Sequence, residues 1–278
     1  MIYLFLFMNK KLIILNTNIG DYMNVLITGG ASNIALEVAK NLSLNNKIYL
    51  TTHTDRQCEY LKEKINNANI ICFKMDVNKD LNKIDKLNID CLISHAGIGI
   101  GGSILGMDIK YLRENFETNF FSNFKLIKKV YDKFEKQGHG KIFVTSSLAS
   151  IIPIPMLGCY CSSKAAISML TNTINQELKI IKSNIKISLI EPGAYHTGFN
   201  QVMINNKEKY LNKESKFYKQ KELFTKLQIL TFKLLEKKKI DTIVNKIVKE
   251  VESDNPKFHI KSPLLQTIGT KIYMLLFR

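Results

Sequence analysis

The chain has 278 residues, 45% of them hydrophobic, which suits one large α/β domain with a buried core. Its formal net charge is +16, but almost every cation is Lys, and Arg occurs at Arg56, Arg113 and Arg278 alone. The planar guanidinium of Arg forms paired hydrogen bonds with bases and phosphates better than the ammonium of Lys does. Because Arg is so scarce, the composition argues against a nucleic-acid binder. It predicts a solvated Lys-rich surface, with an anionic membrane surface or substrate as the alternative.

The five cysteines are scattered singly, apart from Cys159 and Cys161. An odd number without framework spacing predicts reduced thiols inside a cell, and hence a cytoplasmic protein. One C-x-C pair without a second ligand pair predicts no metal site. No apolar run reaches the ~18 residues that a membrane-spanning helix needs.

Residues 1–22 form a separate segment in the sequence pattern. Its apolar run IYLFLF is too short to span a membrane, and lysines follow the run where a secretory signal would place them before it. A start at Met23 would read MNVLITGG and open directly on a buried strand. We interpret residues 1–22 as a dispensable extension or the product of a misplaced start codon.

From residue 24 onward, apolar runs typical of buried strands alternate with stretches of helical spacing. We predict strands at 24–28, 47–52, 71–77, 90–97, 141–147, 185–193 and 257–261. We predict helices at 35–42, 58–65, 108–137, 158–182 and 241–252. Such alternation means parallel strands joined by crossovers. Residues 23–261 are therefore predicted to form a single doubly wound, Rossmann-like sheet with helices on both faces.

Residues 199–240 interrupt this alternation just before the last predicted helix. Ligands of parallel sheets bind outside the carboxyl ends of the strands, so an insertion at this point predicts a substrate lid. The segment carries apolar side chains such as Phe199, Met203 and Phe224 among its lysines. These favour an apolar substrate. A surface helix pair that packs on the protein's own core is the alternative.

The first strand leads through a glycine turn into a helix, in the stretch NVLITGGASNIALEVAKNL. Such a turn presents backbone N–H groups and a helix N-terminus to a phosphate. The stretch resembles the T-G-x-x-x-G-x-G turn of the short-chain dehydrogenase/reductase family, and the resemblance runs from about residue 24 to residue 261. Asn33 and Ala35 replace the second and third glycines. Both changes are mild, since Asn tolerates positive φ and Ala adds one methyl group. The resemblance implies dinucleotide contacts from Thr28, Gly29, Ser32, Asn33 and Ile34.

The end of the second predicted strand bears on the choice of nucleotide. The family's NAD enzymes carry an acidic residue there, which holds the ribose 2′-hydroxyl and repels a 2′-phosphate. This chain has Thr52 and His53, whose hydroxyl and imidazole can accept a phosphate. The resemblance therefore favours NADP(H) over NAD(H) as the cofactor.

Three further motifs resemble family cofactor contacts. Asp76 and Val77 match the adenine-contacting pair, and Ser94-His95-Ala96-Gly97 stands where the family has N-N-A-G. The stretch from residue 192 to residue 197 matches P-G-x-x-x-T, which lies beside the nicotinamide amide. The implied contacts are Asp76, Val77, Ala96, Gly97, Pro192, Gly193 and Thr197.

A tyrosine and a lysine four apart occur twice, at Tyr160–Lys164 and Tyr60–Lys64. Ser147, at the end of a predicted strand, precedes Tyr160 by thirteen residues, which is the family's spacing. Asn119 lies in the long helix that carries the family's asparagine. Tyr60–Lys64 has no such context and is interpreted as a solvated helix face.

The resemblance implies the catalytic roles of these residues. Tyr160 would be the general acid/base, and Lys164 would lower the pKa of Tyr160 and bind the nicotinamide ribose. Ser147 would orient the substrate oxygen. Asn119 would hold a water molecule that links Lys164 to solvent.

These features predict an NAD(P)-dependent oxidoreductase that interconverts a carbonyl and a hydroxyl on a steroid-, retinol- or fatty-acyl-like substrate. The alternative is a catalytically inactive, cofactor-binding regulator of the same fold, since residues 33, 35, 94 and 95 depart from the family pattern. The family resemblance implies a homodimer or homotetramer. For the apolar tail, residues 262–278, we expect capping of the domain or docking of a subunit, with peripheral membrane association as the alternative.

Overall fold

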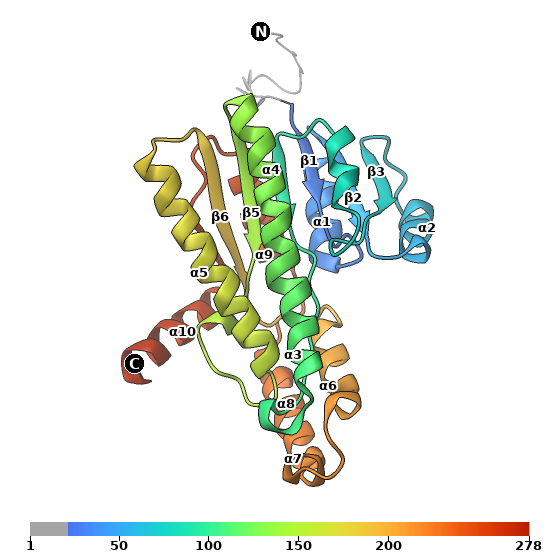
Figure 1. Cartoon of the computed structure of the whole chain (residues 1–278), viewed down its shortest axis with the longest axis vertical. Coiled ribbons are helices and arrows are strands. Elements are labelled where there is room, and N and C mark those ends of the chain that lie inside the picture. Colours follow the sequence, from blue (N-terminus) through green and yellow to red (C-terminus); the bar gives the residue numbers. More distant parts are fainter. Residues whose placement is uncertain (1–21, 278) are drawn as a thin grey trace, which may run out of the picture.

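The computed structural model describes residues 22–277, in which seven parallel strands form one sheet in the order β3-β2-β1-β4-β5-β6-β7 (Figure 1). The interpretation of residues 1–22 falls almost wholly outside the described residues and stays a prediction. The strands are β1 (Asn24–Ile27), β2 (Lys47–Thr52), β3 (Ile70–Lys74), β4 (Cys91–Ser94), β5 (Gly140–Thr145), β6 (Ile185–Pro192) and β7 (His259–Ser262).

Helices cover both faces of the sheet (Figure 1). Within the described residues they are α1 (Asn33–Leu42), α2 (Asp55–Lys64), α3 (Ile109–Phe116), α4 (Asn123–Gln137), α5 (Gly158–Ile180), α6 (Phe199–Tyr210), α7 (Lys216–Lys219), α8 (Lys221–Leu235), α9 (Asp241–Glu252) and α10 (Leu264–Phe277). The predicted doubly wound parallel sheet is confirmed.

The core consists of two apolar layers, one on each face of the sheet. Successive side chains of a strand point to opposite faces. Val25 and Ile27 therefore enter the cluster that includes α1 and α9, whereas Leu26 enters the cluster that includes α4 and α5. This double burial explains why the strands read as continuous apolar runs with no polar alternation.

The helix predicted at 108–137 differs from the structure in one respect. A π-helical turn, Glu117–Ser122, separates α3 from α4. Between β3 and β4, where no helix is predicted, the connection contains a short 3₁₀ helix, Leu81–Lys86.

The lid and the tail are both helical. Residues 199–240 contribute α6, α7 and α8, which extend beyond the sheet at the lower end of Figure 1. The tail forms α10, where Gln266 Oε1 accepts from the backbone N–H of Ala194 (2.7 Å) and Gln266 Nε2 donates to the carbonyl of Leu235 (2.7 Å). The start of α10 is thereby joined to the strand end at β6 and to the end of α8.

Three further findings concern the chemistry of residues 22–277. None of the helices in this range is long and apolar enough to cross a membrane. All five cysteines are free thiols. The range contains no group of three or more His, Cys, Asp or Glu side chains that could hold a metal ion.

Phe134 on α4 provides a test of the core. It is fully buried in the layer beneath α4 and α5, and its ring fills the space that a side chain at Gly140 would occupy. We expect Phe134→Ala to lower the free energy of unfolding by about 3–5 kcal/mol, because it opens a large cavity. Phe124→Ala, on the same helix but 40% exposed, is the matched control and should cost well under half as much. Denaturant midpoints measure both, and equal losses would contradict this packing.

Candidate active site

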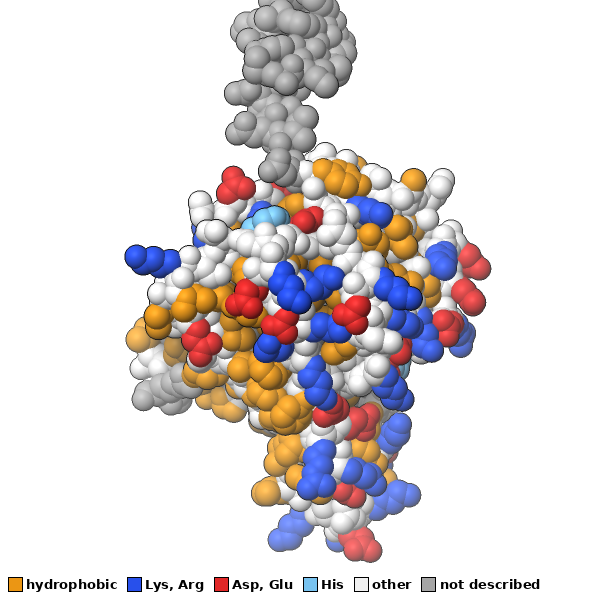
Figure 2. All heavy atoms as spheres, turned by 45° about the horizontal axis from the view of Figure 1, so that its top comes forward, with side chains coloured by type: hydrophobic (Ala, Val, Ile, Leu, Met, Phe, Trp, Pro, Cys, Tyr) orange, Lys and Arg blue, Asp and Glu red, His pale blue; other side chains and the backbone are white. Residues whose placement is uncertain are grey.

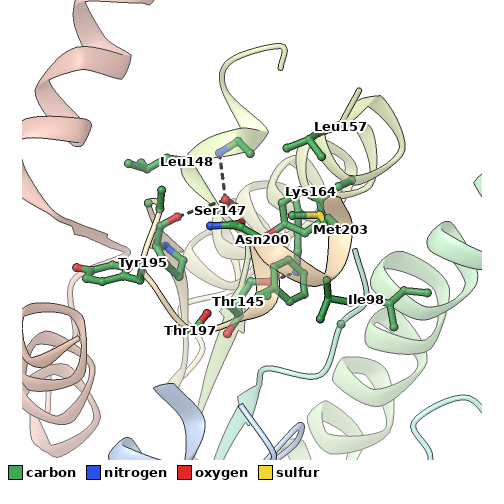
Figure 3. Close-up of a pocket in the computed structure, with 18 of the residues that line it drawn as sticks. Ile98, Thr145, Ser147, Leu148, Leu157, Lys164, Tyr195, Thr197, Asn200 and Met203 are labelled. Carbon is green, nitrogen blue, oxygen red and sulfur yellow. Dashed lines mark hydrogen bonds between the residues drawn. The ribbon is translucent and has the colours of Figure 1, made fainter. Parts of the chain in front are cut away.

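One large cavity, of about 1290 Å³, lies at the carboxyl ends of the strands. Its wall contains the first turn, the segments after β2, β3, β4, β5 and β6, the first turn of α5, and parts of the lid and of α10. In Figure 3, Ser147, Lys164, Thr197 and Met203 gather around it from different elements. The volume exceeds that of common single-ligand pockets, so it suits a large ligand together with a second molecule.

Ser147, Tyr160 and Lys164 all line this cavity. Ser147 follows β5, where its hydroxyl accepts from the Ala149 N–H (3.1 Å) and donates to the Pro192 carbonyl (3.3 Å). Lys164 Nζ donates to the carbonyl of Thr145 (2.9 Å) and lies 5.8 Å from the centre of the Tyr160 ring. The serine is thus held by the end of β6 and the lysine by the end of β5.

Burial moves the pKa values of the tyrosine and the lysine in opposite directions. It raises the pKa of the Tyr160 phenol to about 12, while a hydrogen bond with Ser147 acts the other way. It lowers the pKa of the Lys164 ammonium to about 8. Desolvation is the largest influence on the Tyr160 pKa, and Lys164 is not among the groups that shift it. At neutral pH the tyrosine is a proton donor and most of the lysine is charged.

Asn119 lies in the π-helical turn and is fully buried. Its amide forms two bonds with the backbone of Ile98: the Ile98 N–H donates to Oδ1 (2.8 Å), and Nδ2 donates to the Ile98 carbonyl (2.9 Å). Nδ2 also donates to the Ser163 hydroxyl (3.0 Å). Asn119 thus fixes the segment after β4 against α5. Its expected water-holding role stays a prediction.

Most residues expected to contact the cofactor line the cavity: Gly29, Ser32, Ile34, His53, Asp76, Val77, Ala96, Gly97, Tyr160, Lys164, Pro192, Gly193 and Thr197. Three do not. Thr28 is fully buried, and its hydroxyl accepts from the backbone N–H groups of His95 (3.0 Å) and Ala96 (3.1 Å). Thr52 is buried and donates to the carbonyl of Thr54 (3.1 Å). Asn33 is an exposed residue at the start of α1.

The first turn meets the requirements of a dinucleotide site. Gly29 has φ +74°, and a Cβ there would lie 2.9 Å from the Ala96 backbone, so the position needs glycine. Asn33 has no positive φ, so its expected tolerance of that conformation is not needed. The turn, the N-terminus of α1 and the Ser32 hydroxyl face the cavity together. These groups fit a pyrophosphate.

The altered Ser94-His95 pair has partners of its own. Ser94 Oγ donates to Asn123 Oδ1 on α4, and Asn123 Nδ2 donates to the carbonyl of Thr118 (2.9 Å). His95 lies between Ser32 and Thr145. Burial, aided by the nearby Lys164 ammonium, lowers the pKa of His95 to about 4. The imidazole is therefore neutral at physiological pH.

Residues 199–240, the predicted lid, line one side of the cavity. Met203 of α6 packs against Gly99, where a Cβ would collide with it, and the Phe199 ring lies 5.5 Å from the Tyr160 ring. The sequence pattern marks these apolar side chains but not the carboxylate that joins the two ends of the segment. Glu236 contacts His196 Nδ1 (2.7 Å), Asn200 Nδ2 (2.8 Å) and Gln201 Nε2 (3.1 Å). No local motif marks Glu236, because its partners come from the other end of the lid.

The arrangement agrees with comparisons to known proteins. The family model described as short chain dehydrogenase matches residues 23–209. A probable short-chain type dehydrogenase/reductase, VdlC of Helicobacter pylori, is 30% identical over 194 residues, or 66% of this chain and 69% of that protein. The 3-ketodihydrosphingosine reductase of Bacteroides thetaiotaomicron is 27% identical over 260 residues, or 89% and 90% of the two chains. Bovine retinol dehydrogenase 8 is 29% identical over 63% and 60% of the chains.

Solved structures share the fold across most of the chain. A short-chain dehydrogenase/reductase from Burkholderia phymatum, in complex with NAD, superposes with a TM-score of 0.75 at 19% identity, covering 93% of this chain and 96% of that one. A short-chain dehydrogenase from Burkholderia cenocepacia, in complex with NADP, has a TM-score of 0.67 at 15% identity, covering 92% and 98%. With the match of the family model to most of its length, this chain belongs to the short-chain dehydrogenase/reductase family of oxidoreductases.

Proposed function

We propose that this protein interconverts a ketone or aldehyde and the corresponding alcohol on an apolar, steroid-, retinol- or fatty-acyl-like substrate. The observation that carries the proposal is the meeting of Ser147, Tyr160 and Lys164 in a cavity whose outer wall is apolar. That wall includes Phe199, Met203 and Leu227. A bound nicotinamide would supply the hydride.

Residues of the chain would transfer the proton and stabilise the charges that develop during the reaction. Ser147 would donate a hydrogen bond to the substrate oxygen and stabilise the charge that grows there. Tyr160 would give its proton to that oxygen during reduction and take it back during oxidation. Lys164, held by the Thr145 carbonyl, would bind the nicotinamide ribose and favour the phenolate once the proton has left.

Tyr160→Phe tests this role, and the chain supplies its own control. We expect the variant to bind NADPH within about threefold of wild type but to lose roughly 10²–10⁴-fold in kcat, because the proton donor is gone. The control is Tyr60→Phe, in the other Tyr–Lys pair, where Tyr60 is 54% exposed and Lys64 Nζ lies 4.4 Å from its ring centre. If the wild type binds nucleotide but reduces no apolar ketone, the regulatory alternative is supported instead.

We also propose a preference for NADPH over NADH. The wall after β2 consists of His53 and Gln57, and Asp76 Oδ1, from the segment after β3, lies 3.7 Å from His53 Nδ1. This part of the cavity lacks the acidic residue that would repel a 2′-phosphate at the strand end. Thr52 does not line the cavity, because its hydroxyl donates to the carbonyl of Thr54, and it therefore does not support a preference for NADPH.

His53→Asp tests the preference directly. A carboxylate at this position should weaken NADPH binding about tenfold or more and leave NADH binding within about threefold, because only NADPH carries the 2′-phosphate. His53→Asn removes the imidazole without adding charge and serves as the control. Fluorescence titration of wild type and both variants with each nucleotide measures the six affinities. Tighter binding of NADH by the wild type would show the preference to be wrong.

We propose that the apolar substrate reaches the cavity from a membrane surface. Leu227, Leu235 and Leu265 line the cavity and are also exposed, Leu265 by 83%, so they form its mouth. Around it, α8 exposes Leu223, Leu227, Leu230 and Leu234 at helical spacing, and α10 exposes Leu265, Ile268, Ile272 and Leu275. Lys226, Lys233 and Lys271 are exposed on the same helices. Such helices suit the interface of an anionic bilayer.

Vesicle flotation tests this surface with Leu234→Asn/Leu275→Asn, at two side chains that are 75% and 84% exposed and outside the cavity wall. We expect wild type to float with phosphatidylserine-containing vesicles and the variant to lose at least tenfold in binding, because two leucines leave the lipid. Turnover of a short, water-soluble ketone should not change. Leu44→Asn is the matched control, because Leu44 is 76% exposed and follows the C-terminal end of α1, whereas the N-terminal end of α1 lines the cavity.

The predicted homo-oligomer would use a different surface of the protein. Phe124 of α4 and Met169 of α5 are exposed on the helices through which the family forms dimers or tetramers. Figure 2 shows apolar side chains gathered on the side where α5 and α10 lie in Figure 1. If wild type fails to float and Leu234→Asn/Leu275→Asn instead dissociates an oligomer, the surface of α8 and α10 is a subunit contact.

A further inference from the structure

His95 occupies the floor of the cavity, directly after β4. Its Nε2 lies 2.9 Å from the Ser32 hydroxyl, and its Nδ1 lies 3.1 Å from the Thr145 hydroxyl. The ring therefore connects the two sides of the cavity: the turn at the start of α1 and the end of β5.

The two partners of His95 belong to different parts of the site. Ser32 precedes α1 in the turn and lines the cavity where the pyrophosphate is expected. Thr145 offers its carbonyl to the Lys164 ammonium (2.9 Å). A side chain that fixes the Thr145 hydroxyl thus also constrains the residue that holds Lys164.

Only an imidazole in its neutral form offers one donor and one acceptor nitrogen on opposite sides of a rigid ring. It can therefore serve two hydroxyls at once. Asparagine, the residue of the family pattern at this position, ends near the place of Nδ1 and would reach Thr145 but not Ser32. Glutamine extends to the place of Nε2 and would reach Ser32.

We propose that His95 is a positioning residue that couples the nucleotide-binding turn to the lysine of the catalytic group. The proposal rests on the proposed function in that the nucleotide is taken to bind in this cavity. Through Ser32, His95 shapes the phosphate site. Through Thr145, it holds Lys164 in line with Tyr160.

Substitutions can separate the contributions of the two ring nitrogens. We expect His95→Asn to raise the Kd for NADPH roughly 3–10-fold, the effect of one lost hydrogen bond, and to change kcat less than about threefold. We expect His95→Gln to show the reverse, with kcat lowered roughly 3–10-fold and NADPH binding nearly kept. His95→Ala should lose both. His139→Asn and His139→Gln, at an exposed histidine, are the matched controls.

A second measurement needs no bound nucleotide. In the nucleotide-free protein, a double-mutant cycle of His95→Ala with Ser32→Ala, followed by denaturant unfolding, should give non-additive changes, because either substitution breaks the same contact. The cycle with Thr145→Val should do likewise. Additive changes in both cycles would overturn the bridge even if the wild type bound no nucleotide. Equal effects of Asn, Gln and Ala on both Kd and kcat would overturn the positioning role.

Discussion

The buried ammonium of Lys164 is the group around which the rest of the site is arranged. A cation removed from water costs several kcal/mol unless its donors are paired, and the Thr145 carbonyl pairs one of them. This bond requires the start of α5 to lie over the end of β5. The same burial brings the pKa of Lys164 down to about 8 and that of Tyr160 up to about 12. The site therefore gives up stability in order to hold a neutral phenol and an ammonium group of lowered pKa in the same cavity.

The segment after β4 is fixed from two directions at once. Asn119 bonds both polar groups of the Ile98 backbone, and Thr28 accepts from the backbone of His95 and Ala96. The π-helical turn accommodates the first of these contacts, since it widens the helix where Asn119 points inward. Gly97, between the two anchors, has no side chain, and a Cβ there would lie 3.5 Å from Lys164 Nζ. These contacts hold the segment after β4 in place beside the cavity.

Sequence patterns were sufficient wherever the cause is local. The apolar runs located all seven strands. Ser147, Tyr160 and Lys164 meet because the end of β5 and the start of α5, the next helix in the chain, lie at the same edge of the sheet. The patterns failed at three places. Asn119, in the π-helical turn, bonds Ile98, which lies 21 residues away in the sequence. Asn33 is exposed at the start of α1, and the buried Thr52 donates to the carbonyl of Thr54, so neither lines the cavity as expected. In the sequence, His95 is visible only as a replacement of the family's asparagine. Its hydrogen bonds with the Ser32 and Thr145 hydroxyls become apparent in the structure.

Glu236 bears on how residues 199–240, the proposed substrate-contacting segment, can change over evolution. Its carboxylate joins residues 36 positions apart, so everything between Asn200 and Glu236 is a loop whose ends are already closed. The entropy of closing a loop grows only with the logarithm of its length, and doubling the length costs about 0.6 kcal/mol. Helices in this segment can therefore be lengthened, shortened or exchanged at little cost to the sheet. One carboxylate thus lets the proposed substrate-contacting segment vary independently of the candidate catalytic residues on β5 and α5.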